Sequence, residues 1–304
     1  MCLENSFLGG NPEIMSECLK YQRPNVYCME NALISHNIDF VTFLMNEYKL
    51  PIYPIDCISY NNLESFLVYC DQTNDIDSCF FYSAMIDIPS LCEYFLSHGA
   101  NINTKGYRQA TALQVAARYN CKGIAEFLIL HGANINEKDD DGKTALQFAA
   151  DYNKDEVAEL LILHDASING INKVGRNALQ YAAENNNKAI AELLISHGGN
   201  INEKNEYGKT ALHIAADKNS KEIVELLLLH GANVNESNNK GKTALLIAAE
   251  NNNKEIVELL LLHGANVNES DNDGKTALLI AADNNSKEIA EILISHGANI
   301  NEKK

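Results

Sequence analysis

Residues 238–270 read NNKGKTALLIAAENNNKEIVELLLLHGANVNES, and this stretch determines the fold of most of the chain. Its fourth residue is one of a series of glycines spaced 33 residues apart, at Gly142, Gly175, Gly208, Gly241 and Gly274. Six copies in one register run 106–138, 139–171, 172–204, 205–237, 238–270 and 271–303, and a degenerate copy occupies 73–105. Such a period predicts stacked repeats, because a single unit cannot bury its own apolar faces.

Each copy predicts two short helices. In 238–270, Thr243 is a good N-cap for a first helix with an apolar face, and residues 251–253 are asparagines whose side chains compete for backbone hydrogen bonds and end it. Residues 254–262 form the second helix, with apolar residues at helical spacing. Gly264 suits the left-handed position that closes a helix.

The 33-residue spacing and two motifs resemble the ankyrin repeat. The motifs are G-K-T-A-L-x-x-A-A early in the unit and L-L-x-x-H-G-A-N-x-N late in it. The resemblance covers about two-thirds of the chain and implies an all-α ankyrin-repeat solenoid of helix-turn-helix units with β-hairpin loops. The chain departs from the family in lacking the proline of T-P-L-H in every copy. Gln109 replaces the hairpin glycine of the first copy and Asp165 the closing glycine of the second, so we expect weaker turns there.

Residues 1–72 show no clean 33-residue register but still read as helices. We expect them to form a diverged helical-hairpin N-terminal cap domain, followed by the degenerate repeat 73–105 and the six repeats of 106–304. Asn11-Pro12 predicts a helix start, with the helix running to about Tyr21. Further helices are expected over 28–35, 38–48, 55–60 and 63–69, with Pro51 and Pro54 as breakers. The segment looks similar to the uncharacterised domain that precedes ankyrin arrays in many protist, notably trichomonad, proteins.

Composition excludes several classes of function. The chain has 24 Lys and Arg against 41 Asp and Glu, a net charge of −17. That charge disfavours binding to nucleic acid or to anionic membranes. No apolar run approaches the roughly 20 residues that span a bilayer, and the N-terminus does not read as a signal peptide. Eight cysteines without a CxxC spacing suggest reduced thiols, so we expect a cytoplasmic, intracellular protein.

No catalytic residue, metal ligand or cofactor is expected. Seven histidines recur at 33 residues, but successive copies lie about 8–10 Å apart, too far for two of them to share one metal ion. Each precedes a helix-closing residue, where it can bond the last carbonyls. His213 falls where the ankyrin family makes a local hydrogen bond. An enzyme-linked role, with a site in residues 1–72, stays an alternative although no motif supports it.

Surface recognition is the remaining function, and we expect a non-catalytic module that binds a protein partner on the concave face of the stack. Tyr and Arg side chains, which dominate interface hot spots, concentrate in the first repeats. The expected partner-binding residues are Tyr107, Arg108, Arg118, Tyr119, Asp140, Asp141, Tyr152, Arg176 and Tyr207. The net charge favours a partner with a basic patch. Self-association is the other alternative, because the last repeat keeps apolar Ile289, Ile292 and Leu293 where a polar outer face is usual.

Overall fold

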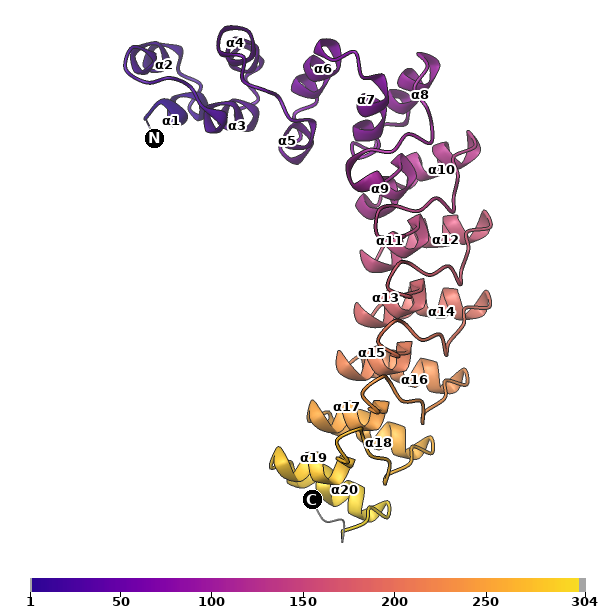
Figure 1. Cartoon of the computed structure of the whole chain (residues 1–304). Helices are drawn as coiled ribbons and strands as arrows, with labels where there is room; N and C mark the ends of the chain where they lie inside the picture. Colours follow the sequence, from indigo (N-terminus) through magenta and orange to yellow (C-terminus); the bar gives the residue numbers. More distant parts are fainter. Residues whose placement is uncertain (1, 301–304) are drawn as a thin grey trace. The chain divides into compact units, whose positions relative to one another are not determined.

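The computed structural model describes residues 2–300 and divides into two compact units, Met1–Gly106 and Tyr107–Lys304 (Figure 1). Twenty α-helices lie within the described residues, where strand-like pairing is confined to isolated bridges such as Ser237 with Thr243 and Ser270 with Thr276. The all-α class is therefore confirmed. The three-part division at residues 72 and 105 stays a prediction.

The first unit contains eight short helices. They are α1 (Cys2–Leu8), α2 (Pro12–Leu19), α3 (Val26–Ile34), α4 (Ile38–Tyr48), α5 (Pro54–Ser59), α6 (Leu63–Gln72), α7 (Ile76–Ser83) and α8 (Pro89–Ser97). Aromatic side chains fill its interior: Phe66 is fully buried, and Phe7 meets Phe40 edge to face with ring centroids 5.4 Å apart. The unit thus has a core of its own, built from neighbouring helices.

The structure corrects the predicted helices of this unit in two places. Helix α1 was not expected, because its seven residues carry no clear cap and too few turns for a periodic signal. Pro54 begins α5 instead of ending a helix, which suits proline because the first helical N–H needs no partner. Asn11 caps α2 as predicted, since its side chain accepts from the N–H groups of Glu13 and Ile14.

The second unit consists of six helix pairs, after a one-turn 3-10 helix at Tyr107–Gln109. The first helices of the pairs are α9 (Ala112–Tyr119), α11 (Ala145–Asp151), α13 (Ala178–Glu184), α15 (Ala211–Asp217), α17 (Ala244–Glu250) and α19 (Ala277–Asp283). The second helices are α10 (Lys122–Leu130), α12 (Asp155–Leu163), α14 (Lys188–Ser196), α16 (Lys221–Leu229), α18 (Lys254–Leu262) and α20 (Lys287–Ser295). First helices stack on first helices and second on second, in two parallel rows (Figure 1).

The predicted local signals explain these helices. Thr243 caps α17 by accepting from the Leu246 N–H at 3.4 Å, and Asn252, at φ 57°, separates α17 from α18. Gly264 follows α18 at φ 84°, the left-handed conformation expected of it. The alanine pairs of the first helices are fully buried from α9 to α17, which lets neighbouring helices approach closely, whereas Ala282 of α19 is exposed.

Asparagines tie the loops after successive second helices together. Asn235 Oδ1 accepts from the Asn266 N–H at 2.8 Å, and its Nδ2 donates to Gly264 O at 3.2 Å. The equivalent Asn268 accepts from the Asn299 N–H at 2.8 Å. The repeated N-x-N motif is therefore explained by hydrogen bonds between neighbouring repeats.

Candidate protein-binding face

The hairpin tips and the ends of the first helices form one continuous face of the second unit, here called the hairpin face. It comprises residues 107–110, 118–119, 140–143, 151–152, 173–176, 184–185, 206–209, 217–218, 239–242, 250–251, 272–275 and 283–284. Backbone bonds join adjacent tips, as where the Asn239 N–H donates to Tyr207 O at 3.1 Å. Asn205 Oδ1 also accepts from the N–H groups of Tyr207 and Lys209, each at 3.0 Å. These bonds give the face an ordered backbone.

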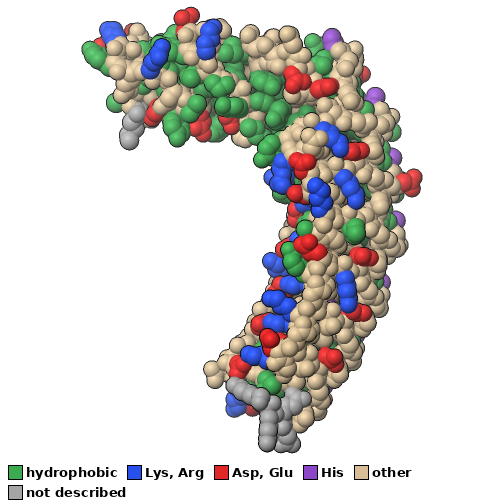
Figure 2. Space-filling model, in the orientation of Figure 1, with side chains coloured by type: hydrophobic (Ala, Val, Ile, Leu, Met, Phe, Trp, Pro, Cys, Tyr) green, Lys and Arg blue, Asp and Glu red, His purple; other side chains and the backbone are tan. Residues whose placement is uncertain are grey.

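Ion pairs recur on this face with a spacing of eight residues. A base in the hairpin bonds an acid at the end of the following first helix in five successive repeats, Lys143–Asp151, Arg176–Glu184, Lys209–Asp217, Lys242–Glu250 and Lys275–Asp283. Figure 2 shows the resulting mixture of basic and acidic side chains along this edge of the second unit. Burial would raise the pKa of Asp217, but the hydrogen bond and charge of Lys209 outweigh it and hold the pKa below its ordinary value.

Lys143 is the most enclosed base of this series. Its side chain is only 10% exposed, and its Nζ lies 4.4 Å from the ring centroid of Tyr181 and 4.6 Å from that of Phe148. The Arg176 guanidinium also lies over the Tyr181 ring, 4.8 Å from its centroid. Phe148 and Tyr181 were missed by the sequence reasoning. The available signal was that aromatic residues replace Val115, or the isoleucine of later copies, at one position of the first helix.

The first repeat lacks this ion pair. Ala110 stands where the later copies have the base, and Arg118 stands where they have the acid. The Arg118 guanidinium lies 4.9 Å from the ring centroid of Tyr152 and 5.7 Å from that of Tyr119. The structure therefore brings three of the predicted partner-binding residues into one cation–π cluster, with both tyrosines exposed.

Two more predicted residues pair with each other in the first two hairpins. Arg108 Nη2 lies 2.8 Å from Asp141 Oδ2, and both side chains are more than half exposed. The backbone is strained there, because Arg108 and Gln109 both adopt left-handed conformations, at φ 57° and 56°. Tyr107 is 73% exposed, and Asp140, also exposed, joins the neighbouring tip through its N–H, which donates to Arg108 O at 3.0 Å.

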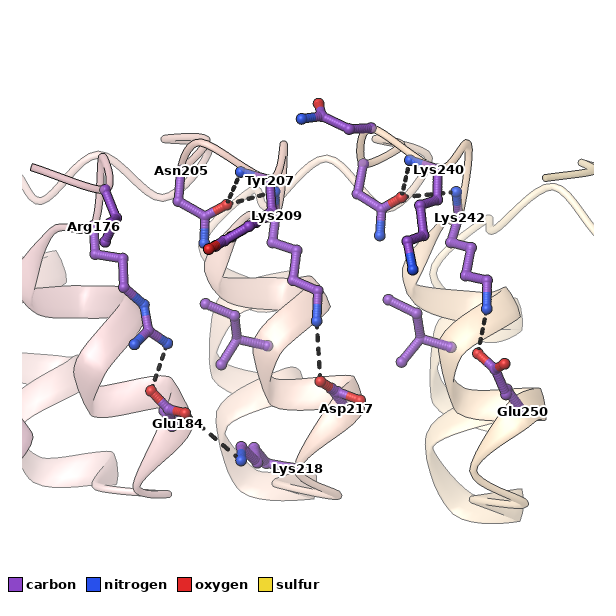
Figure 3. Close-up of a pocket in the computed structure, with 15 residues that line it drawn as sticks. Arg176, Glu184, Asn205, Tyr207, Lys209, Asp217, Lys218, Lys240, Lys242 and Glu250 are labelled. Carbon is purple, nitrogen blue, oxygen red and sulfur yellow. Dashed lines mark hydrogen bonds and ion pairs between the residues drawn. The ribbon is translucent and has the colours of Figure 1, made fainter. Parts of the chain in front are cut away.

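A hollow on this face lies over the third to fifth repeats (Figure 3), and we call it the hairpin groove. Its volume is about 790 Å³. It is lined by Val174, Arg176, Glu184, Asn205, Tyr207, Lys209, Ile214, Asp217, Lys218, Asn238, Asn239, Lys240, Lys242, Ile247 and Glu250. Of the predicted residues only Arg176 and Tyr207 line it. The other seven lie on the first two repeats, outside it.

A second set of side chains links each first helix to the next hairpin. The Gln114 Nε2 group donates to Glu137 O and Lys143 O at 2.7 and 2.8 Å, and Gln114 Oε1 accepts from the Thr111 N–H at 2.7 Å. Gln147 and Gln180 make the corresponding donations one and two repeats later. Leu246 and Leu279 occupy the same position in the last two repeats, where no such bond is made between described residues.

His213 takes this bridging position in the fourth repeat. Its Nε2–H donates to Lys242 O at 3.0 Å, while Nδ1 accepts from the Thr210 N–H at 3.2 Å. Burial in this site is the main cause that lowers the pKa of His213 to about 4, and two nearby lysines add to it. The Thr210 N–H can only donate, so a proton on Nδ1 would place two donors opposite each other and remove this hydrogen bond. The predicted structural role is confirmed.

The histidines that recur at 33 residues close the second helices. In each case the ring Nδ1–H donates to the carbonyl four residues earlier, as from His131 to Phe127 O at 2.7 Å and from His263 to Leu259 O at 2.9 Å. Their predicted interaction with the last carbonyls is thus confirmed. Within residues 2–300, no group of three or more His, Cys, Asp or Glu side chains is placed to hold a metal ion.

Thiols are the candidate nucleophiles of the first unit. Burial raises the pKa of Cys57 to about 12 and raises the pKa of Cys92 as well. A hydrogen bond with Cys70 lowers the pKa of Cys79, against the effect of burial. Both thiols line one hollow of the first unit together with His98, whose ring Nδ1–H is already used in a hydrogen bond to Tyr94 O at 2.7 Å.

Across residues 2–300 the longest apolar stretch of any helix is too short to cross a bilayer. The comparison with curated proteins gives no match. Residues 1–69 match the family model described as a domain of unknown function, DUF3447. The human ASB11 ankyrin repeat domain, a crystal structure, is similar in fold, with 23% identity and a TM-score of 0.65 over 72% of this chain and 98% of that one.

The family model for ankyrin repeats matches three overlapping segments, residues 80–172, 146–238 and 212–304. Together they cover well over half of the chain. Ankyrin repeats generally mediate protein–protein interaction, and the fold is typically a non-enzymatic module. The paired helices, the hairpins and the match across six repeats show that the chain belongs to the ankyrin repeat family.

Proposed function

We propose that this chain is a non-catalytic module that binds a protein partner on the hairpin face of its second unit. The observation that carries the proposal is the hairpin groove, which is open to solvent and built on an ordered backbone. Tyr207, 60% exposed at its rim, supplies a large side chain of the kind that dominates interfaces. A preformed face of this sort binds with little backbone change.

Site-specific photo-crosslinking tests this function. A photoreactive amino acid replaces Tyr207 in the groove or, as a matched control, Leu229, which is 68% exposed at the end of α16. Each protein is irradiated in cell extract, and captured proteins are identified by mass spectrometry. A partner captured from position 207 and not from position 229 supports binding at the hairpin face. Equal capture from both, or capture from 229 alone, contradicts it.

The predicted residues of the first two repeats are tested separately. A variant carrying Tyr107→Ala, Arg118→Ala, Tyr119→Ala and Tyr152→Ala removes the cation–π cluster, with folding checked by circular dichroism. If capture from position 207 persists unchanged in this variant, the partner uses the groove without the early repeats. If capture falls, the binding surface includes both the first two repeats and the hairpin groove.

Self-association through the last repeat is the alternative with an observation in its favour. Leu278 and Leu279 on α19 are partly exposed, whereas the equivalent Leu245 and Leu246 are each 1% exposed. Sedimentation over a wide concentration range tests it: a mass that rises with concentration and returns to the monomer in Leu278→Lys supports self-association, and a monomer throughout contradicts it.

A further inference from the structure

The charge of the hairpin groove is opposite in sign to that of the whole chain. Five of its lining residues are basic and three are acidic, a net charge of +2, against −17 for the protein. The neighbouring hairpin tips carry no excess of bases, since Asp140 and Asp141 stand with Lys143 in the second repeat and Asp273 stands with Lys275 in the sixth. The groove is therefore a basic segment of the hairpin face.

The basic groups keep unused bonding capacity. Lys209 and Asp217 form a 3.1 Å pair whose side chains are 32% and 42% exposed, and such solvated pairs contribute little energy. A lysine ammonium has three N–H donors, so it can donate to a second carboxylate while it remains bonded to the first. Lys240, exposed at the rim, makes no ion pair with any residue from 2 to 300.

The spacing of these groups selects the shape of a ligand. Arg176, Lys209 and Lys242 occupy one position in three successive repeats, and their side chains line the groove side by side, each reaching the acid of its own repeat (Figure 3). Stacked helices lie about 8–10 Å apart. A polyproline II segment advances about 3.1 Å per residue with three residues per turn, so every third side chain returns to the same side after about 9 Å. The spacing of the bases along the stack therefore agrees with the spacing of every third side chain in polyproline II.

Resting on the proposed function, we infer that the groove binds an extended acidic segment of a partner protein, in polyproline II conformation, with a carboxylate at every third residue. The carboxylates meet the bases of successive repeats, and Lys240 adds a further positive charge. The Tyr207 ring, at the rim, offers the aromatic surface on which proline-rich segments pack. Because the groove is lined by residues of three repeats, the segment spans about three repeats.

Synthetic peptides test this inference on the full chain by fluorescence anisotropy. The probe is a labelled peptide of three Glu-Pro-Ala triplets. One control has the same composition with its glutamates adjacent, and another has lysine in place of glutamate. We expect the periodic acidic peptide to bind about fivefold more tightly than the clustered one, the effect of one or two solvated charge contacts. The lysine peptide is expected not to bind, and raised salt should weaken the acidic peptide.

A pair of charge-reversal variants locates the binding. Lys240→Glu reverses an unpaired charge at the groove, and Lys188→Glu makes the same change on α14, where Lys188 forms only an exposed pair with Glu192. The first should weaken the acidic peptide at least about fivefold and the second should leave it unchanged. Equal affinity for all three peptides, tighter binding of the lysine peptide, or equal loss in both variants overturns the inference. Crosslinking from position 207 is read independently, so the proposed function survives such a result.

Discussion

Replacing His213 with glutamine should remove a defined part of the acid sensitivity of the second unit. The pKa of His213 is about 4 in the folded chain against 6.5 for the free side chain, so the unfolded chain binds the proton more readily. The stabilising contribution is therefore fully present above pH 6.5 and is lost as the pH falls toward 4. Linkage gives roughly 2 kcal/mol lost by pH 5 and about 3 kcal/mol in all.

Glutamine is the appropriate replacement because Gln114, Gln147 and Gln180 already make the same bridge in the preceding repeats. At pH 7.5 we expect His213→Gln to unfold in urea at nearly the same midpoint as the parent chain. His213→Leu imitates the last repeats and loses the bridge, at a cost of about 1 kcal/mol at neutral pH.

The assay is urea unfolding followed by far-UV circular dichroism between about pH 4.5 and 7.5, the range in which this histidine contributes. Carboxylates titrate in all three proteins, so the difference between the parent chain and His213→Gln isolates the histidine. The reasoning is refuted if the two proteins lose stability in parallel over this range, or if the ring of His213, followed by NMR, titrates near its ordinary pKa.

Three further substitutions test other features. Gln109→Gly should raise the free energy of unfolding by about 0.5–1 kcal/mol, because it relieves a left-handed backbone at φ 56°; a lower urea midpoint would show that the turn is not strained. Lys143→Met should cost about 1–2 kcal/mol by leaving Asp151 without its enclosed partner, whereas Lys275→Met, in a pair about half exposed, should cost less than about 0.5 kcal/mol; equal effects would contradict this ranking. Asn235→Ala should cost about 1 kcal/mol in thermal unfolding through its lost bonds to Gly264 and Asn266, and an unchanged melting temperature would remove the asparagine ladder as a source of stability.

The repeated part of the chain could be predicted closely from sequence because each signal acts locally. Thr243 as an N-cap and Gly264 as a closing residue depend only on residues within one turn. Six copies of the same wording then fix the stacking partner of each helix, since every unit presents the same apolar faces. Helix α1 escaped prediction for the opposite reason, as it is short and has no repeated counterpart.

The candidate site was predicted less completely. Counting Tyr and Arg selected residues of the first three repeats and Tyr207; Arg176 and Tyr207 line the groove over the third to fifth repeats, and the other seven residues stay a prediction. The groove is lined by side chains of three repeats, whose arrangement in space a residue list does not convey. The net charge of −17 does not describe the lining of the groove, which has the opposite sign, and the expected partner with a basic patch stays a prediction. The resemblance to trichomonad proteins stays a prediction.

The bridging side chains also set how strongly adjacent repeats are coupled when the array unfolds. Gln114, Gln147, Gln180 and His213 fasten each of the first four repeats to its successor, and Leu246 ends the series. In a linear array, stability is a sum of unit and nearest-neighbour terms, so opening should start in the fifth and sixth repeats and travel toward the N-terminus. Because His213 holds the last bridge, mild acid should detach those two repeats as a separate cooperative segment. Hydrogen exchange would then show early loss of protection in α17 to α20 while α9 to α14 remain closed.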